Sequence, residues 1–170
     1  MGLILETKRL RLRELEADRD AQFVCELLNT PKFIKYIGDR GVRSTDDARD
    51  FIADRYAASY RDHGYGLYAV ETLDCTKVGI CGFVKRDYFD HPDIGFAFLP
   101  EHEGRGYGKE SAAAVMHFGR EKLGFTKVLG ITSLDNETSA GLLVKNGFQD
   151  DGIIEPQGEK LRMFSYTFDQ

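Results

Sequence analysis

The sequence has few features that would suggest a membrane or secreted protein. It contains only 4 prolines and no low-complexity run. It also lacks any apolar stretch approaching the ~20 residues that a membrane-spanning helix needs. An apolar run of three residues, Leu3 to Leu5, is followed by charge, so no secretory signal peptide is expected. These absences predict a globular protein without a membrane partner.

An excess of positive charge is absent as well. The formal net charge is −5, which argues against a nucleic-acid partner, because such proteins normally carry a basic face. The one basic stretch, residues 7–14, alternates Arg9, Arg11 and Arg13 with leucines. This alternation is typical of a half-buried strand with a solvated face.

Cysteines and histidines form no recognisable metal or disulfide pattern. Cys25, Cys75 and Cys81 make no C-x-x-C pair and leave an odd count, which favours reduced thiols in a cytoplasmic protein. Cys81 lies in a strand with Ile80 and Phe83 and is expected in the core. The four histidines share no ligand spacing, so no metal is expected.

The chain length suits one domain, and neither a linker nor an internal repeat interrupts residues 1–170. A first strand is expected over residues 9–14. Apolar residues at helical spacing then predict a helix that Asp18 caps and that ends near Asn29, before Pro31. A second helix is expected over residues 43–60, with Ser44 as its N-cap.

From Gly66 the period of the apolar residues changes from 3.6 to 2. Residues 66–72, 77–87 and 92–100 predict three strands joined by short turns, hence an antiparallel meander. Strand 92–99, helix 106–122 and strand 127–132 then form a β-α-β unit with parallel strands. A helix that Gly147 stops, followed by strands near 149–154 and 160–168, completes the chain. The predicted class is α/β, with a mixed, mostly antiparallel sheet.

The segment PEHEGRGYGKE, residues 100–110, lies between a strand and a helix and holds glycines at 104, 106 and 108. Alternating glycines let consecutive backbone amides converge without intervening side chains. The first N–H groups of the helix lack partners there, and the helix dipole adds partial positive charge. With Arg105 and Lys109 at the rim, the loop predicts a diphosphate site.

Two other phosphate loops and a bland alternative compete with this interpretation. A Walker loop needs glycine at 103 and Ser or Thr at 110, where the chain has Glu103 and Glu110. A dinucleotide fingerprint needs G-x-G-x-x-G, and this spacing fails even though Asp135 is suitably placed for the required acid. The structural alternative is a glycine-rich turn that binds nothing.

LPEHEGRGYGKESA, followed about thirty residues later by NETSAGLLVKNGF, resembles the GNAT acetyltransferase superfamily. The resemblance is closest to the branch of ribosomal-protein N-terminal acetyltransferases and of diamine and spermidine acetyltransferases, and it covers nearly the whole chain. It implies the GNAT acyltransferase fold. The family pattern [QR]-x-x-G-x-[GA] falls on Glu103, Gly106 and Gly108. Glu103 departs from this pattern, so its side chain is expected to point away from the phosphates.

The resemblance implies that acetyl-coenzyme A lies in a wedge where two central strands splay apart. The backbone of Ala97, Phe98 and Leu99 would then pair with the pantetheine arm like an added strand. Asn136 matches a family position that contacts pantetheine or orders a water, although an N-cap alone is the simpler interpretation. The pyrophosphate would be held by the loop residues Gly104, Arg105, Gly106, Tyr107, Gly108 and Lys109.

Acetyl transfer to an amine also needs a base for the amine proton and a proton for the thiolate. Asp93 is the candidate base, near a position where relatives carry an acid, and a strand-start carboxylate is its alternative. Many relatives carry a tyrosine acid where this chain has Leu143. The N-x-x-S of residues 136–139 resembles the ribosomal-protein branch, which uses a serine hydroxyl near the sulfur. This resemblance implies Ser139 as the proton donor, and an ordinary first-turn helix residue is its alternative.

These residues predict an N-acetyltransferase that moves acetyl from acetyl-coenzyme A to a primary amine by direct transfer in a ternary complex. The acceptor is either a protein N-terminus or a small-molecule amine, and a homodimer is left open. No metal cofactor is expected. Two alternatives are a catalytically silent coenzyme-A-binding module and a nucleotide-binding protein.

Overall fold

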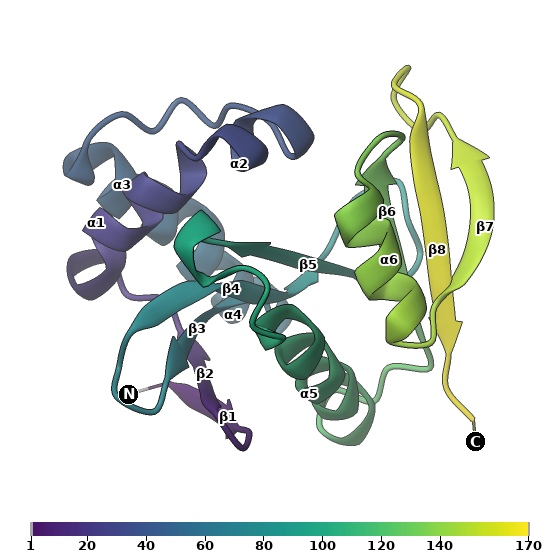
Figure 1. Cartoon of the computed structure of the whole chain (residues 1–170), viewed down its shortest axis with the longest axis horizontal. Coiled ribbons are helices and arrows are strands. Elements are labelled where there is room, and N and C mark those ends of the chain that lie inside the picture. The colour runs from purple at the N-terminus through teal and green to yellow at the C-terminus, as the bar shows by residue number, and fades with distance from the viewer. Residues whose placement is uncertain (1, 170) are drawn as a thin grey trace.

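A computed structural model describes residues 2–169, which form one mixed β-sheet with helices on both faces (Figure 1). The strands are β1 (Leu3–Glu6), β2 (Leu10–Glu14), β3 (Leu67–Thr72), β4 (Lys77–Val84), β5 (Asp93–Phe98), β6 (Lys127–Ser133), β7 (Gln149–Ile154) and β8 (Leu161–Thr167). The helices are α1 (Ala17–Leu28), α2 (Pro31–Tyr36), α3 (Thr45–Phe51), the π-helical turn η1 (Ile52–Ala57), α4 (Ala58–His63), the 3₁₀ turn η2 (Pro100–His102), α5 (Tyr107–Glu121) and α6 (Glu137–Lys145).

The sheet has the strand order β1-β2-β3-β4-β5-β6-β8-β7. Strands β1 to β5 form an antiparallel meander. Strand β6 lies parallel to β5 and follows it through α5, and the pairs β6–β8 and β8–β7 are antiparallel. The predicted α/β class, with a mostly antiparallel sheet around a central β-α-β unit, is therefore confirmed.

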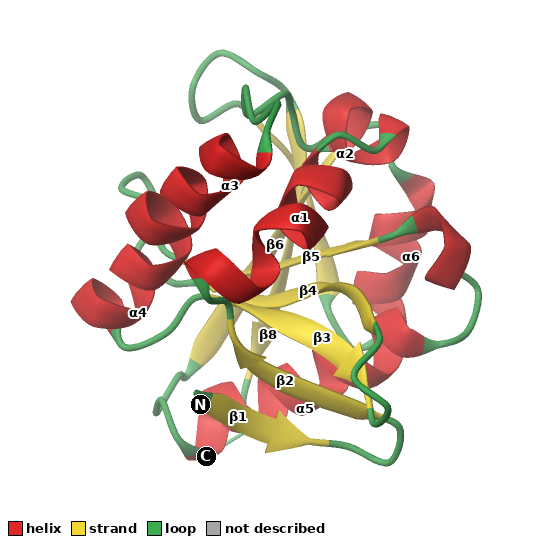
Figure 2. Cartoon of the chain, turned by 90° about the vertical axis from the view of Figure 1, so that its left-hand side faces the viewer, coloured by secondary structure: helices red, strands yellow, loops and turns green. Residues whose placement is uncertain are grey.

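Two apolar cores lie on opposite faces of this sheet. In Figure 2, α1 and α3 lie in front of the sheet and α5 lies behind it. Side chains of the first helices pack with Ala69 and Ile80 in one core, whereas α5 and α6 pack with Val70, Phe83 and Ile94 in the other. Cys81 belongs to the second core and is fully buried, which raises the pKa of its thiol to about 12. The expectation of a core cysteine is confirmed.

Two elements were missed because each is short. Strand β1 has four residues and pairs only with β2, at the edge of the sheet. Pro31 ends α1 as expected, but it also occupies the first position of α2, where its missing N–H costs nothing. Thr30 caps that helix by accepting a hydrogen bond from the Phe33 N–H at 3.3 Å.

Of the predicted helix ends, those at Ser44 and Gly147 are confirmed and the one at Asp18 is wrong. Ser44 caps α3 by accepting from the Asp47 N–H at 3.0 Å, and Gly147 follows α6 with φ +89°, as expected. The cap predicted at Asp18 is wrong, because α1 begins one residue earlier and Glu16 holds the N-cap position. The Glu16 N–H donates instead to the carboxylate of Asp20, at 2.8 Å.

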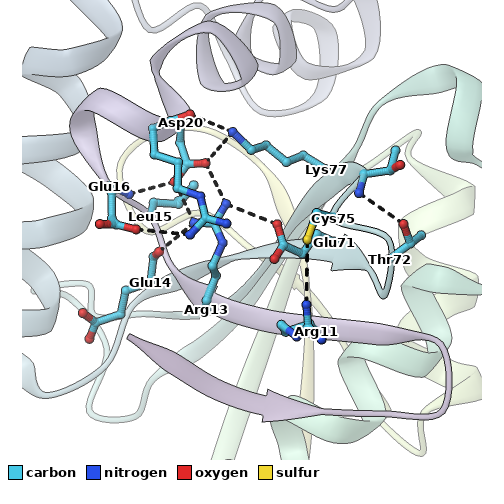
Figure 3. Close-up of polar contacts among 12 residues, drawn as sticks. Arg11, Arg13, Glu14, Leu15, Glu16, Asp20, Glu71, Thr72, Cys75 and Lys77 are labelled. Carbon is cyan, nitrogen blue, oxygen red and sulfur yellow. Dashed lines mark hydrogen bonds and ion pairs between the residues drawn. The ribbon is translucent and has the colours of Figure 1, made fainter. Parts of the chain in front are cut away.

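The arginines of the strand at residues 9–14 were expected to lie on a solvated face. This expectation is wrong for Arg13, which is buried. Its side chain is 3% exposed and forms a bidentate pair with Asp20, with both N···O distances 2.9 Å (Figure 3). Glu71 of β3 and Lys77 of β4 complete the buried group, at 3.3 Å from Arg13 and 2.9 Å from Asp20. A buried guanidinium is tolerated here because two carboxylates surround it.

The same group fixes the ionisation of Asp20. Burial alone would raise its pKa, but hydrogen bonds from Arg13, the Glu16 backbone and Lys77 hold the pKa of Asp20 at about 2. Because this value lies below that of an unfolded aspartate, the group stabilises the fold above about pH 4 and loses this effect as the pH falls toward 2. The network thereby fixes α1 against β2, β3 and β4.

Candidate functional site

The central strands β5 and β6 pair over only two residues each, Asp93 with Leu129 and Ile94 with Gly130. Beyond these pairs the strands separate, and Figure 1 shows β5 crossing the centre while β6 stands apart with β8 and β7. We call the facing, unpaired backbone of residues 95–98 and 131–133 the β5/β6 wedge.

Burial along β5 supports this description. Asp93 and Ile94 are buried, whereas the four residues from Gly95 to Phe98 are each half-exposed. The neighbouring strand β4 is buried over its six central residues. A strand in the middle of an eight-stranded sheet would normally be covered along its whole length, so the second half of β5 faces an opening.

The residues at the end of β5 differ in whether their backbone N–H and C=O groups point toward β4 or toward the wedge. The Leu99 N–H donates to the Val78 carbonyl at 2.9 Å, so this amide is already engaged with β4. Neighbouring residues of an antiparallel strand direct their polar groups to opposite edges. Of the three residues predicted to pair with a ligand arm, Phe98 is therefore the one whose backbone faces the wedge.

The glycine loop follows η2 and leads into α5. Gly104 and Gly106 have φ values of +78° and +82°, which side chains disfavour, and Gly106 is the N-cap residue of α5. Gly108 has a different role, because a Cβ there would lie 2.5 Å from Cδ1 of Leu142 in α6. Two glycines thus shape the loop, and the third permits close packing of two helices.

The loop leaves backbone donors free at the start of α5. The Glu110 N–H is the first to bond within the helix, donating to the Gly106 carbonyl at 3.1 Å. The preceding amides of Tyr107, Gly108 and Lys109 have no acceptor within the helix. Arg105 and Lys109 are exposed beside them. This arrangement has the donors and the charge that an anion site requires.

Arg9 holds this loop from the opposite end of the chain, and no sequence pattern had indicated it. Its guanidinium donates to the carboxylate of Glu110 at 2.7 Å and to the Arg105 carbonyl at 2.9 Å, and it lies 4.8 Å from the centre of the Tyr107 ring. The Thr7 hydroxyl also bonds to Glu110. These bonds outweigh partial burial and hold the pKa of Glu110 below its ordinary value.

The Glu103 side chain, which departs from the family pattern, is engaged outside the loop. Its carboxylate lies 2.7 Å from the ammonium group of Lys32 in α2. The pair is partly exposed and contributes little to stability. It nevertheless gives the carboxylate a cationic partner in α2, which agrees with the expectation that this side chain turns away from the loop.

Asn136 and Ser139 lie together at the start of α6. The side-chain oxygen of Asn136 accepts from the Ser139 N–H at 3.2 Å, so the capping role of Asn136 is confirmed. Ser139 is half-exposed in the first turn. Leu143, the position at which the resemblance implies a tyrosine in many relatives, is 1% exposed and packs in the core.

Asp93 lies at the closed end of the wedge, where β5 still pairs with β6. It is 2% exposed, and one carboxylate oxygen lies 3.0 Å from Nε of Arg86. Burial raises the pKa of Asp93 to about 6 even though Arg86 acts in the opposite direction. The pKa of the Asp93 carboxyl thus lies closer to neutral pH than that of an ordinary aspartate.

Residues 2–169 contain neither a candidate metal site nor a helix suited to spanning a membrane. No cluster of three or more His, Cys, Asp or Glu side chains within that range has a geometry that would hold a metal ion. None of the helices in that range combines the length and apolar character needed to cross a membrane.

Comparisons with known proteins agree with this geometry. Residues 9–149 match the family described as acetyltransferase (GNAT) domain. An uncharacterized N-acetyltransferase, YoaA of Bacillus subtilis (strain 168), is 30% identical over 153 residues, which cover 89% of this chain and 85% of that protein. The chain belongs to the GNAT acetyltransferase family and is an acyltransferase.

Solved structures show how widely this fold is shared. A ribosomal-protein alanine acetyltransferase from Vibrio fischeri has a TM-score of 0.79 at 14% identity, covering 98% of this chain and 97% of that one. A variant of the spermidine N-acetyltransferase from Vibrio cholerae has a TM-score of 0.74 at 18% identity, covering 95% of each chain. Because the identities are low, these two likenesses show the fold alone.

The glycine loop gives a direct test of donor binding. Replacing Gly106 by Val forces a branched residue into a φ of +82° and places side-chain atoms beside free amides. We expect the affinity for acetyl-coenzyme A to fall by ~1–3 kcal/mol, measured by calorimetric titration. Gly124→Val is the matched control, because Gly124 has φ +71° and open space at the other end of α5. Equal affinity in folded Gly106→Val protein and in the control would contradict the loop assignment.

Proposed function

We propose that the protein is an N-acetyltransferase that moves the acetyl group of acetyl-coenzyme A directly to a primary amine, with both substrates bound at once. One observation carries this proposal. The β5/β6 wedge and the free amides of the glycine loop lie at the same end of β5. A donor with an amide-containing arm and a diphosphate needs an unpaired strand edge beside an anion site.

The donor would bind with its diphosphate at the glycine loop and its thioester toward the closed end of the wedge. The loop Gly104–Lys109 would bind the diphosphate through the amides that begin α5, with Arg105 and Lys109 adding charge. From there the pantetheine arm would enter the wedge along Phe98, between Ala97 and Leu99, and extend toward the closed end. Asn136, at the start of α6, would lie beside this arm. The thioester would then reach the middle of the sheet.

Transfer forms a C–N bond between the amine and the acetyl carbon and breaks the C–S bond to coenzyme A. The amine nitrogen loses a proton, which we assign to Asp93, directly or through water, because a carboxylate with a pKa of about 6 accepts protons near neutral pH. The departing thiolate gains a proton, which we assign to the hydroxyl of Ser139, and solvent restores that hydroxyl.

The acceptor is an amine of one of two classes. The structural neighbours named above act, by their names, on ribosomal protein and on spermidine, so a protein N-terminus and a small polyamine are the first acceptors to test. Homodimer formation and a cytoplasmic location remain predictions. All three cysteines are free thiols, which is consistent with a reducing compartment.

A silent coenzyme-A-binding module is the second candidate, and one observation favours it. Leu143 occupies the position of the tyrosine acid of relatives and is buried in the core. Such a module would bind the donor without transferring its acetyl group. A nucleotide-binding protein would instead prefer NAD or ATP.

Thermal unfolding and an acceptor screen separate these functions. Acetyl-coenzyme A at about 100 times its Kd is expected to raise Tm by roughly 5–10 °C, because a ligand of the folded state alone stabilises it by mass action. Thiol release with a panel of amines and N-terminal peptides measures turnover. A shift without turnover on any acceptor would favour the silent module. A shift with NAD or ATP but not with acetyl-coenzyme A would exclude the proposal.

Asp93 is tested through the pH dependence of turnover. Asp93→Asn is expected to lower kcat about 10²–10⁴-fold and to remove the rise of kcat/KM through about pH 6. Arg86→Met is the matched control: it keeps the carboxylate but removes the charge that lowers its pKa, so the rise should move to higher pH. If Asp93→Asn lowers Tm but leaves kcat and the pH profile unchanged, Asp93 is structural.

Ser139 is tested by separating turnover from donor binding. Ser139→Ala removes the hydroxyl but keeps the N–H that Asn136 caps. If the hydroxyl protonates the thiolate, kcat should fall about 10²-fold while donor affinity stays within a few-fold. Thr138→Ala, one residue earlier and exposed, is the control. Unchanged kcat in Ser139→Ala would leave solvent as the proton source.

A further inference from the structure

Thr132 carries a buried hydroxyl that nothing in the structure satisfies. It lies on β6 within the wedge, is 5% exposed, and its Oγ1 has no hydrogen-bond partner among residues 2–169. Within residues 2–169, only Arg13 Nε and His102 Nδ1 are also buried side-chain polar atoms without a partner. Burying a hydroxyl without a hydrogen bond is unfavourable, so such a group calls for an explanation.

The face to which this hydroxyl belongs follows from the strand register. Thr132 pairs with Arg162 of β8 and shares its face of the sheet with Gly130 two residues earlier. A Cβ on Gly130 would touch Leu143 of α6. Arg162 lies 3.4 Å from Glu137 in the first turn of α6. The Thr132 side chain therefore lies beneath the first turn of α6, close to where Asn136 begins the helix.

The level of Thr132 along the wedge follows from the same register. Leu129 pairs with Asp93 and Gly130 with Ile94. Continuing this register by two residues places Thr132 level with Phe96, about halfway between the closed end and the last residue of β5. The two strands have separated at this level, so the space beside Thr132 is where the middle of a bound donor arm would run.

We propose that the Thr132 hydroxyl hydrogen-bonds an amide group of the pantetheine arm. This inference rests on the proposed function, because it takes the wedge as the donor site. An amide offers both an N–H and a carbonyl oxygen, and a hydroxyl can donate to one or accept from the other. Binding would supply the hydrogen-bond partner that the Thr132 hydroxyl lacks in the free protein. This hydrogen bond would therefore increase the affinity for the donor.

Two substitutions isolate the hydroxyl. Thr132→Val keeps the branched shape and removes the oxygen, whereas Thr132→Ser keeps the oxygen and removes a methyl group. We expect Thr132→Val to weaken acetyl-coenzyme A about tenfold in calorimetric titration, and Thr132→Ser to stay within threefold of the wild type. Without ligand, Thr132→Val should have an equal or higher Tm, because it loses an unsatisfied buried group.

A second ligand locates the contact. Adenosine 3′,5′-bisphosphate carries phosphates but no pantetheine arm, so Thr132→Val should bind it as the wild type does, whereas Gly106→Val should bind both ligands poorly. The proposal is overturned if Thr132→Val binds acetyl-coenzyme A as tightly as the wild type, or if it weakens both ligands equally. If the folded wild type binds the bisphosphate but not acetyl-coenzyme A, the wedge is not the donor site and both proposals fall.

Discussion

Parallel pairing between β5 and β6 stops after Ile94 and Gly130, which leaves backbone N–H and C=O groups of two central strands without ladder partners. Each such group costs about 1–3 kcal/mol if it is buried unpaired, so the gap must contain water or a ligand. Gly79 permits a close approach between β4 and β5, because a Cβ there would lie 2.4 Å from the Ala97 carbonyl oxygen. Strand β5 thereby stays close to β4 as β6 turns away. The β5/β6 wedge depends on this early separation.

The amino-terminal half of the chain contacts the glycine loop at the open end of the wedge. Arg9 pairs with Glu110 and Lys32 with Glu103, so the β1–β2 turn and α2 both contact the segment around the glycine loop. Exposed pairs of this kind are weak individually. The buried Arg13–Asp20 pair fixes α1 against β2, the strand that begins directly after Arg9. Loop geometry is thus set by contacts between distant parts of the chain.

Much of the fold was predictable because its signals are local. Alternating apolar residues identified the meander and the β-α-β unit, and single side chains marked the ends of helices at Ser44, Asn136 and Gly147. The position of the glycine loop was predictable for the same reason, since glycine is the residue that adopts positive φ without strain, as Gly104 and Gly106 do. The errors occurred where local signals are weak: the four-residue strand β1, the one-and-a-half-turn helix α2, and the cap at Asp18.

The sequence by itself determined the class of sheet, the position of the glycine loop and the family resemblance, because each depends on residues within a few positions of one another. Tertiary structure decided that Arg13 is buried, that Gly108 serves packing against Leu142, that Arg9 holds the loop, and that Thr132 has no partner. These properties depend on neighbours that lie between seven and about a hundred residues away in the chain. Whether a polar group is satisfied is decided by which atoms surround it, and that is fixed only when the sheet and its two helical layers have assembled.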